Sequence, residues 1–378
     1  MAEQLNSYAD LYRKTGPWTT VYVDASTGTV DTLRAGDILP DRVRDVLSGQ
    51  GISKPDLRAV EEAIAPATGM PAPVSRYVLV RDGNVEVNEV LPGPMTGPEK
   101  ISVETVPDLL PLIKQRGDDF PYVVAEVGRD GGEIRLQYAR RGGVAEEHAV
   151  EGDRENLKKV PTGGWEQGRR QHRTEEIWRK NADEIAAAID KVVRSCGARL
   201  LIVAGDIRAR ELVVDQLSEA SRAIEATVDS HTRTGGADPK AFQEEVSRLV
   251  AEVWARQQQE ILDRLAVQKG QSHPVSATGY GNVVSALQQA QVDRLILEDS
   301  SLTGHEAFVL DQEPWIATQK SDALGGRVLG SMAAPAALVR AAALTDAKVS
   351  LVPPGVLDPG TKVAALLRWP TGPDVPHS

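Results

Sequence analysis

The sequence predicts a chain of mixed α/β and α+β domains, and two observations lead to this prediction. The 378 residues correspond to two or three domains at roughly 100–200 residues each, and 41% are hydrophobic, enough for separate cores. Short apolar or alternating runs, typical of strands, are interspersed with longer runs at the helical period. We therefore expect an α+β N-terminal domain, a mixed-sheet middle domain with an extended basic loop, and a C-terminal α/β/α sandwich.

The first domain is expected over residues 1–117. Residues 76–81 and 84–90 are strand-like and flank Asp82-Gly83, a two-residue turn that typically closes a hairpin. Prolines at 92, 94 and 98 interrupt regular structure before a helix that ends at Gly117. The other expected elements are a helix at 5–14, a strand at 19–24, short helices at 41–47 and 54–64, and that last helix at 103–115.

The middle domain is expected over residues 118–268. A basic loop at 158–173 is followed by Thr174, the expected cap of a helix that Gly197 ends. Residues 200–204 are continuously apolar and flanked by helices, which predicts a central strand. The other expected elements are an antiparallel meander of strands at 122–127, 133–138 and 146–150, a helix at 209–219, a strand at 226–228 and a long helix at 239–267.

The last domain is expected over residues 269–378, after a polar joint. Helical and strand-like runs alternate along it, which is typical of an α/β/α sandwich. The expected elements are helices at 281–290 and 335–344, and strands at 292–297, 307–310, 348–352 and 363–369.

The net charge argues against a protein that coats nucleic acid, because binding to phosphate needs Lys and Arg. The chain has 43 Lys and Arg against 54 Asp and Glu, a net charge of −11, of which −6 falls in residues 1–120, −2 in 121–270 and −3 in 271–378. Residues 158–173 reverse this sign, because five Lys and Arg residues there oppose Glu166 alone. The local charge is therefore +4.

Several kinds of site are absent from the sequence. The single cysteine, Cys196, excludes an internal disulfide, and we expect it to be a buried packing residue. The six histidines lack metal-ligand spacing, and neither a nucleotide-binding glycine motif nor the serine-hydrolase elbow occurs. No apolar stretch is long enough to span a bilayer or act as a signal region. We expect a cytoplasmic protein without a metal, a cofactor or a membrane partner.

Three other features have ordinary structural explanations. Asp206 follows the expected central strand, where α/β sheets bind ligands, but a helix cap is the simpler role. The acidic pairs Asp118-Asp119 and Glu298-Asp299 are expected in solvated loops. The hairpin tip Arg81-Asp82-Gly83 is expected to be a plain surface turn, with contact to a partner as the alternative.

The candidate binding segment is the basic run 158–173, which has almost no hydrophobic residue to bury. Its glycines let the backbone approach a surface, its tryptophan offers a stacking face, and its arginines offer forked donors to phosphate. A surface loop whose charges are merely solvated is the alternative. The residues that we assign to rRNA contact are Lys158, Lys159, Gly163, Gly164, Trp165, Gln167, Arg169, Arg170, Gln171, His172 and Arg173.

The order of these parts resembles the archaeal and eukaryotic class-1 release factors and their relative Pelota, in the form of their bacterial homologues. Gly163-Gly164-Trp165 occupies the place of the family's Gly-Gly-Gln, before a basic run and a long helix. In the last domain, residues 279–287 and 292–297 are similar to the family's helix-then-strand signature, and residues 348–352 and 363–369 to its terminal strands.

The resemblance implies binding in the ribosomal A site, with the first domain towards the decoding centre and the 158–173 loop in the peptidyl-transferase centre. It also implies contact with rRNA of both subunits and a translational GTPase, EF-Tu in bacteria, as partner; DNA is not expected. Glutamine does not follow Gly163-Gly164, so the group that positions water for release is missing from its place. The chain is similar to Balon-type factors, which occupy the vacant A site of idle ribosomes, so we predict a hibernation factor that is not an enzyme.

Two alternatives stay open. Gln167 or Gln171 could position a water for ester hydrolysis if the loop were shifted by two or six positions, giving a peptidyl-tRNA hydrolase or a ribosome-rescue release factor. A protein–protein adaptor that uses the acidic surface is the other alternative. It would leave Trp165 and the neighbouring arginines without a role.

Overall fold

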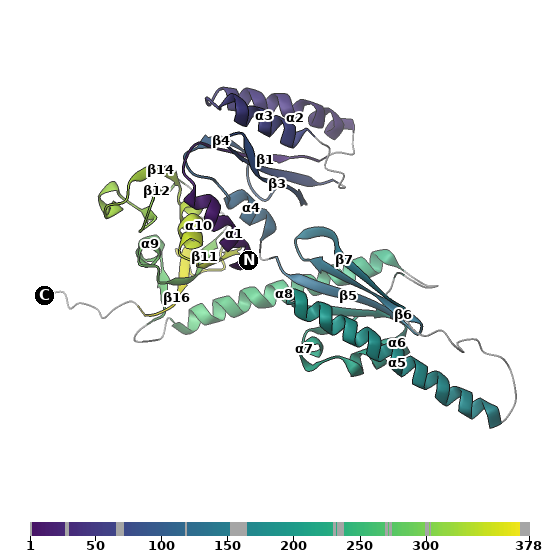
Figure 1. The fold of residues 1–378 in the computed structure, drawn as a ribbon. Coiled ribbons are helices and arrows are strands. Elements are labelled where there is room, and N and C mark those ends of the chain that lie inside the picture. Colours follow the sequence, from purple (N-terminus) through teal and green to yellow (C-terminus); the bar gives the residue numbers. More distant parts are fainter. Residues whose placement is uncertain are drawn as a thin grey trace. The chain divides into compact units, whose positions relative to one another are not determined.

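The computed structural model of the chain consists of helices and mixed sheets that form two compact units (Figure 1). Unit 1 combines Met1–Asp118 with Gln258–Ser378, and unit 2 is Asp119–Gln257. The predicted class, α/β and α+β, is confirmed, and the division into three domains stays a prediction. The structure describes residues 2–26, 30–65, 72–117, 119–151, 165–229, 232, 238–268, 271, 274–298, 302 and 304–370, with the backbone alone for 2–7, 30–38, 142 and 165–175.

The first part of unit 1 is an antiparallel sheet covered by helices on both faces. Its elements are α1 (Ala2–Arg13), β1 (Trp18–Asp24), α2 (Val30–Ser48), α3 (Lys54–Ile64), β2 (Val74–Arg81), β3 (Asn84–Pro92), β4 (Lys100–Glu104) and α4 (Leu110–Arg116). The strand order is β3-β2-β1-β4. Valines that alternate along β1 and β2 pack against α2 and α3, while Trp18, Tyr22 and Tyr77 share the other core with α1 and α4. The predicted hairpin of β2 and β3 is confirmed.

The predicted helix at 103–115 is wrong in its first half. Val103 belongs to β4, which pairs with β1 from Trp18↔Glu104 to Tyr22↔Lys100. The β-branched residues Ile101 and Val103 favour a strand, and Pro107 disfavours a helical conformation just before it. The helix therefore begins only at Leu110.

The outer edge of β4 is covered by the side chain of Gln50. Its Nε2 donates to the carbonyl of Ile101 at 3.0 Å, and its Oε1 accepts from the amide of Val103 at 2.9 Å. One residue of a neighbouring strand would satisfy the backbone in the same way. The Gln50 amide therefore occupies the hydrogen-bonding groups that this edge strand presents there.

The last part of unit 1 is an α/β/α sandwich, as predicted. Its elements are β10 (Ser276–Thr278), α9 (Tyr280–Gln288), β11 (Val292–Glu298), β12 (Glu306–Leu310), β13 (Ile316–Ala317), β14 (Val328–Ala333), α10 (Ala334–Leu344), β15 (Lys348–Val352) and β16 (Val363–Leu367), with a short 3₁₀ helix at Lys320–Ala323. The main sheet has the order β10-β16-β11-β15, and β13-β12-β14 form a smaller one. Helices α9 and α10 cover one face of the main sheet, and Ile261, Leu262 and Leu265 of α8 (Pro239–Gln268) cover the other.

Unit 2 is a mixed sheet in the order β7-β6-β5-β8-β9. Its other elements are β5 (Pro121–Gly128), β6 (Gly131–Tyr138), β7 (Arg141–Glu151), α5 (Trp165–Cys196), β8 (Leu201–Gly205), α6 (Ile207–Gln216), α7 (Glu219–Arg222) and β9 (Glu225–Thr227). The predicted meander is formed by β5, β6 and β7, and the predicted central strand is β8, which runs parallel to β5 and β9.

Two cores hold unit 2 together. Helices α5 and α6 pack on one face of the sheet, and the first half of α8 packs on the other through Phe242 and Val246 (Figure 1). We call the end at which β5, β8 and β9 terminate the carboxyl end of the sheet, and the opposite end its amino end. Ligand sites of α/β sheets form at the carboxyl ends of the strands, so residues of a functional site are expected at this end of unit 2.

Candidate functional site

The residues assigned to rRNA contact fall partly in α5 and partly outside the described residues. Lys158, Lys159, Gly163 and Gly164 lie outside the described residues. The remaining ones form the first turns of α5, of which the structure describes the backbone alone: Trp165, Gln167, Arg169, Arg170, Gln171, His172 and Arg173. Their contacts to rRNA therefore stay a prediction.

Half of the predicted basic loop is helical. Helix α5 begins at Trp165, so the prediction of a loop through residue 173, with Thr174 as the helix cap, is wrong. Glu, Gln and Arg are strong helix formers, and they outweigh the single Gly168 in these turns. Gln167 and Gln171 consequently lie about one helical turn apart, as do Arg169 and Arg173. We call residues 165–173 the basic end of α5.

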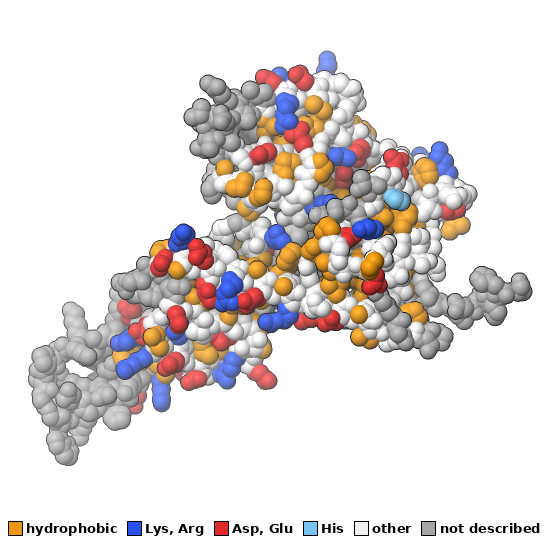
Figure 2. Space-filling view, turned by 180° about the vertical axis from the view of Figure 1, so that it is seen from behind, with side chains coloured by type: hydrophobic (Ala, Val, Ile, Leu, Met, Phe, Trp, Pro, Cys, Tyr) orange, Lys and Arg blue, Asp and Glu red, His pale blue; other side chains and the backbone are white. Residues whose placement is uncertain are grey.

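The described surface elsewhere carries both signs of charge. On the face drawn in Figure 2, Lys and Arg side chains are interspersed with Asp and Glu. On α8, for example, Arg248 pairs with both Glu245 and Glu252 at helical spacing. The +4 charge of residues 158–173 contrasts with this mixed surface.

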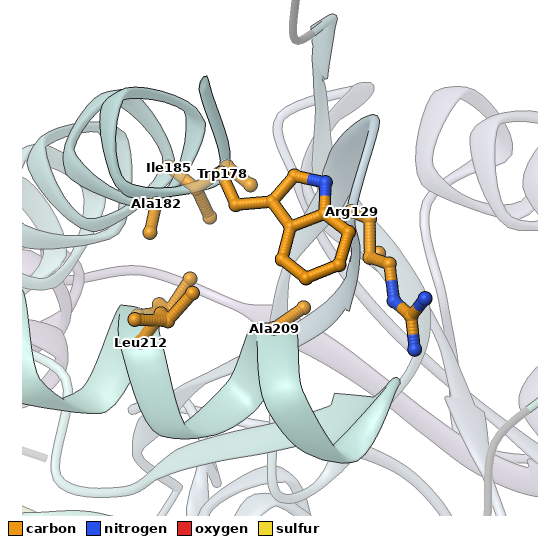
Figure 3. A pocket seen from close by; sticks show the side chains of 8 residues that line it. Arg129, Trp178, Ala182, Ile185, Ala209 and Leu212 are labelled. Atoms are coloured by element: carbon orange, nitrogen blue, oxygen red, sulfur yellow. The ribbon is translucent and has the colours of Figure 1, made fainter. Parts of the chain in front are cut away.

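Helix α5 is fixed to the carboxyl end of the sheet by Arg129 and Trp178. The guanidinium carbon of Arg129, just after β5, lies 4.9 Å from the ring centre of Trp178, a cation–π distance. In Figure 3 the indole ring lies above Ala209 of α6, with Arg129 beside it. The amide of Asn181, also on α5, donates to the backbone carbonyl of Arg129 at 3.1 Å. A cavity of about 10 Å³, lined by Arg129, Trp178 and Ala209 among others, can hold no more than about one water molecule.

Asp206 connects the same arginine to α6. Its Oδ2 lies 3.0 Å from Arg129 Nη2, and its Oδ1 accepts from the amides of Arg208 and Ala209. The prediction that Asp206 caps α6 is therefore confirmed, and Asp206 forms an ion pair with Arg129 as well. We call Arg129, Trp178, Asn181 and Asp206 the Arg129 cluster.

Gly205 allows Asp206 to reach this position. Its φ is +113°, and a Cβ atom at residue 205 would lie 2.1 Å from the carbonyl oxygen of Val127 on β5. Any side chain would collide with backbone there, so the approach of β8 to the end of β5 requires glycine. Sequence reasoning singled out Asp206 but missed Arg129 and Trp178, which are 77 and 28 positions before it.

The contacts of Asp206 lower its pKa. Partial burial by itself raises the pKa of Asp206, but the hydrogen bonds from Arg129, Ala209 and Arg208 outweigh it and leave the pKa below its ordinary value. The carboxylate is thus charged and fully engaged near neutral pH. Such a carboxylate positions other groups and is a poor general base.

Two carboxylates expected in solvated loops are buried instead, and that prediction is wrong for both. Asp119, with a side chain 1% exposed, accepts from the amide of Arg140 at 3.0 Å and from Arg141 Nε at 2.7 Å. Glu298, with a side chain 2% exposed, lies 2.9 Å from Lys362 Nζ. Burying a carboxylate is costly unless it is paired, and local sequence does not reveal partners so distant along the chain. Asp118 and Asp299 lie outside the described residues.

Trp254 of α8 and Arg140 complete a second cluster at the amino end of the sheet. The guanidinium carbon of Arg140 lies 4.8 Å from the ring centre of Trp254. Together with Asp119 and Arg141 these residues form what we call the Asp119 cluster. It holds Asp119, the first residue of unit 2, and the last turns of α8 within that unit.

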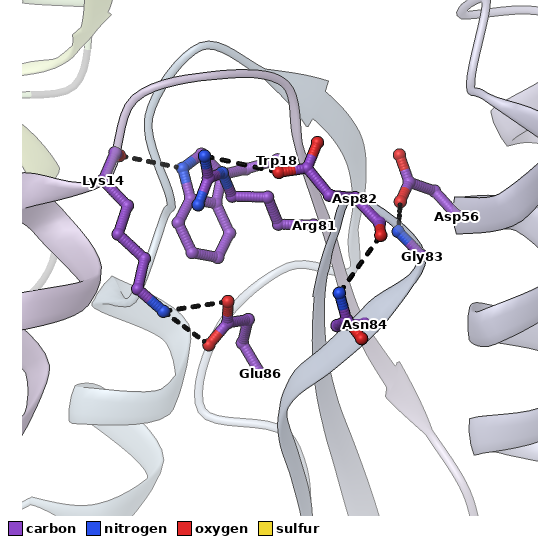
Figure 4. Close-up of polar contacts among 8 residues, drawn as sticks. All are labelled: Lys14, Trp18, Asp56, Arg81, Asp82, Gly83, Asn84 and Glu86. Carbon is purple, nitrogen blue, oxygen red and sulfur yellow. Dashed lines mark hydrogen bonds and ion pairs between the residues drawn. The ribbon is translucent and has the colours of Figure 1, made fainter.

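The predicted hairpin tip is fixed to α3 (Figure 4). The buried Asp56 accepts from the amide of Gly83 at 2.6 Å and from the hydroxyl of Ser53, which caps α3. Arg81 lies over the ring of the buried Trp18 and pairs with Asp82 at 3.3 Å. These contacts are typical of a rigid surface turn, and contact of this tip with a partner stays an untested alternative.

The other sequence predictions concern Cys196, metals and membranes. Cys196 is half-buried and packs against the core between α5 and the sheet, and burial raises the pKa of its thiol. Within the described residues, no group of three His, Cys, Asp or Glu side chains could hold a metal ion. No described helix combines the length and the apolar character needed to cross a membrane.

Comparisons with known proteins match part of the chain to a family. Residues 121–271 match the family described as bacterial archaeo-eukaryotic release factor family 2. Protein Rv2629 of Mycobacterium tuberculosis, uncharacterized, is 26% identical over 287 residues, which are 75% of each chain.

The solved structures to which the chain shows similarity include archaeal and yeast proteins. Dom34 of S. cerevisiae, a translation termination-like factor, is 12% identical with a TM-score of 0.43 and covers 80% of this chain and 81% of its own. Archaeoglobus fulgidus Pelota is 17% identical with a TM-score of 0.33 and covers 79% and 80%. The match of residues 121–271 includes β5, the Arg129 cluster and the whole of α5. Within residues 121–271 the chain is therefore similar to the bacterial archaeo-eukaryotic release factors.

Proposed function

We propose that the chain is a ribosome hibernation factor that binds the vacant A site and directs residues 158–173 towards the peptidyl-transferase centre, without codon-dependent peptide release. The release-factor family of residues 121–271 supports a ribosomal site of action. Binding there would place the protein in the cytoplasm. EF-Tu as companion and contact with rRNA of both subunits belong to the same proposal and derive from the resemblance.

The observation that carries this proposal is the position of the basic run. Its residues 165–173 form the first turns of a helix of 32 residues whose later residues, from Ala182 onward, are packed in the core of unit 2. At 1.5 Å per residue, the basic end lies roughly 15–25 Å along the helix from Ala182. A rigid helix that carries arginines at one end is suited to probing a narrow RNA site.

The absence of glutamine after Gly163-Gly164 supports binding over hydrolysis. Release of a peptide requires a polar group that holds water in line with the ester and a preorganised site for the oxyanion. The indole of Trp165 offers neither a water-positioning carbonyl nor a hydroxyl. Binding that blocks the A site requires no such group.

Cosedimentation with idle ribosomes tests the proposal. We expect the chain to pellet with ribosomes whose A site is empty, and binding to weaken in the double variant Arg169→Ala/Arg170→Ala. The slope of log affinity against log salt should flatten by roughly one unit per lost phosphate contact. Arg248→Ala, which removes a paired arginine from α8, is the matched control and should bind as the parent does. No binding to empty ribosomes would refute the proposal.

The second candidate function is a peptidyl-tRNA hydrolase or rescue release factor that uses Gln167 or Gln171. Their spacing of about one turn on α5 favours it, because both could serve a single water site. Release of labelled peptide from ribosome-bound peptidyl-tRNA measures this activity. Release by the parent that is lost in Gln167→Ala/Gln171→Ala would establish it, and release retained in that variant would exclude these glutamines.

A further inference from the structure

The last described side-chain anchors of α5 before its basic end are Trp178 and Asn181. From Ala182 to Val193, buried side chains recur at helical spacing and pack on the sheet. Glu176, Arg179 and Lys180 are exposed. Trp165 is 13 residues before Trp178, a distance of about 20 Å along the helix axis. A change of about 10° in the direction of the helix at Trp178 would therefore move Trp165 by roughly 3 Å, enough to break a hydrogen bond.

Arg129 makes three connections at this point. Its guanidinium stacks on Trp178, its Nη2 pairs with Asp206, and its carbonyl accepts from Asn181, which is 2% exposed. One residue at the end of β5 is thus bound to α5 at two positions and to the cap of α6. The side-chain contacts of Arg129 reach α5 at Trp178, four residues nearer the basic end than Ala182, the first buried apolar residue there.

We propose that Arg129 is a positioning residue that sets the direction in which the basic end of α5 leaves the sheet. What that end contacts rests on the function proposed above. The direction itself is a property of the free protein, because every group involved belongs to unit 2. The opposing possibility is that packing from Ala182 onward fixes α5 alone and Arg129 only neutralises Asp206.

The orientation of the basic end can be measured with spin labels on the full chain. In a Cys196→Ser background, labels at His172→Cys and Glu244→Cys report the distance from the basic end to α8. We expect one narrow distance distribution in the parent and a distribution at least twice as wide in Arg129→Ala. Arg208→Ala, an exposed arginine at the start of α6, is the matched control and should leave the width unchanged.

A second label pair separates positioning from unfolding. Labels at Lys191→Cys and Glu244→Cys lie on the packed half of α5 and on α8, so their distribution should stay narrow in Arg129→Ala. If it broadens too, Asp206→Asn replaces Arg129→Ala, because asparagine keeps the helix cap while breaking the ion pair. Trp178→Phe keeps an aromatic face for the guanidinium and should keep the narrow distribution, whereas Trp178→Ala should widen it. An unchanged width at residue 172 in both Arg129→Ala and Asp206→Asn would overturn the proposal.

Ribosome binding then links position to function. We expect Arg129→Ala to weaken cosedimentation about three- to tenfold while the salt slope stays unchanged, because the phosphate contacts are the same but less often aligned. An affinity equal to that of the parent, despite a widened distribution, would overturn the functional part. If the parent itself does not bind ribosomes, the proposed function fails, and the spin-label result still decides whether Arg129 positions α5.

Discussion

The two ends of the unit 2 sheet carry the same kinds of side-chain contact, but the aspartates in these contacts are buried to different degrees. At each end an arginine lies 4.8–4.9 Å from a tryptophan ring centre, and an aspartate accepts from an arginine side chain. In both tryptophans the indole N–H is buried without a hydrogen-bond partner among the described residues. The Arg129 cluster assigns stacking and ion pairing to one arginine, whereas the Asp119 cluster divides them between Arg140 and Arg141.

The difference lies in the aspartates. The side chain of Asp119 is 1% exposed, and that of Asp206 is 34% exposed. A buried carboxylate that loses its partner is costly, while a partly exposed pair contributes little. The contacts at the amino end, where the chain enters unit 2, are thus buried and costly to break. The carboxyl end, where α5 meets the sheet, has a more exposed and therefore weaker ion pair.

The largest effect is expected from Gly205→Ala, which would break the carboxyl end. The new Cβ would collide with the Val127 carbonyl, so the local free energy of unfolding should fall by at least about 3 kcal/mol. This loss corresponds to hydrogen exchange in β5 and β8 that is more than about 100-fold faster. Exchange followed by mass spectrometry measures this. Gly197→Ala, with φ +62° but nothing within 4 Å of the new Cβ, is the control and should cost only about 1 kcal/mol. Equal losses would show that the collision is relieved by a backbone shift.

Removing each aspartate compares the two ends directly. Asp119→Ala should cost about 2 kcal/mol, because it leaves Arg141 and the amide of Arg140 without their buried acceptor. Asp206→Ala should cost about 1 kcal/mol, mostly the lost helix cap. Hydrogen exchange in peptides 131–151 and 205–216 reads the two ends separately. A larger loss of stability in Asp206→Ala than in Asp119→Ala would show that the carboxyl end carries the stronger contact.

Replacing single arginines tests whether one residue performs both tasks at the carboxyl end. Arg129→Ala removes the stacking contact and the ion pair together and should cost about 1.5 kcal/mol, whereas Arg140→Ala removes stacking alone and should cost roughly 0.5–1 kcal/mol. Exchange in the same two peptides is the measurement. A further variant, Arg129→Lys, keeps the charge but loses the planar guanidinium. Its local stability should lie between that of the parent and that of Arg129→Ala.

The smallest effect is expected from acid. The pKa of Asp206 is lowered in the folded chain, so its stabilising contribution is complete above the unfolded pKa of about 3.9 and is lost as the pH falls through the folded value. The contribution should stay within about 1 kcal/mol because the side chain is one-third exposed. Exchange in peptide 205–216 should be up to fivefold slower in the parent than in Asp206→Asn at pH 6, and this difference should shrink as the pH falls below about 3.9. A difference independent of pH would contradict the assignment.

Much of the fold could be predicted because its signals are local. Asp82-Gly83 predicted a hairpin, the apolar run before Gly205 predicted the central strand, and Asp206 predicted a cap. Short strands such as β10, β13 and β14 were missed because two to six residues carry too little periodicity. The start of α5 was misplaced because two glycines and a basic run suggested a loop, although the intervening residues favour helix.

The candidate site could be predicted only in part. The basic run is a local signal, and the sequence shows it directly. The Arg129 cluster is not local, because Arg129, Trp178 and Asp206 are brought together only when β8 aligns beside β5 and α5 crosses the sheet. The same limit explains why Asp119 was placed in a solvated loop. Its partners at 140 and 141 are its neighbours only after the meander has formed.

The Gln50 amide on the edge of β4 hinders the pairing of two copies of this chain through their strand edges. An open strand edge is a template on which a second copy can add its own strand, and such additions lead to aggregates. Here one glutamine takes up the carbonyl of Ile101 and the amide of Val103, two groups that an incoming strand would need first. A single residue outside the sheet thus lowers the number of unpaired backbone groups that this edge offers to a second copy of the chain.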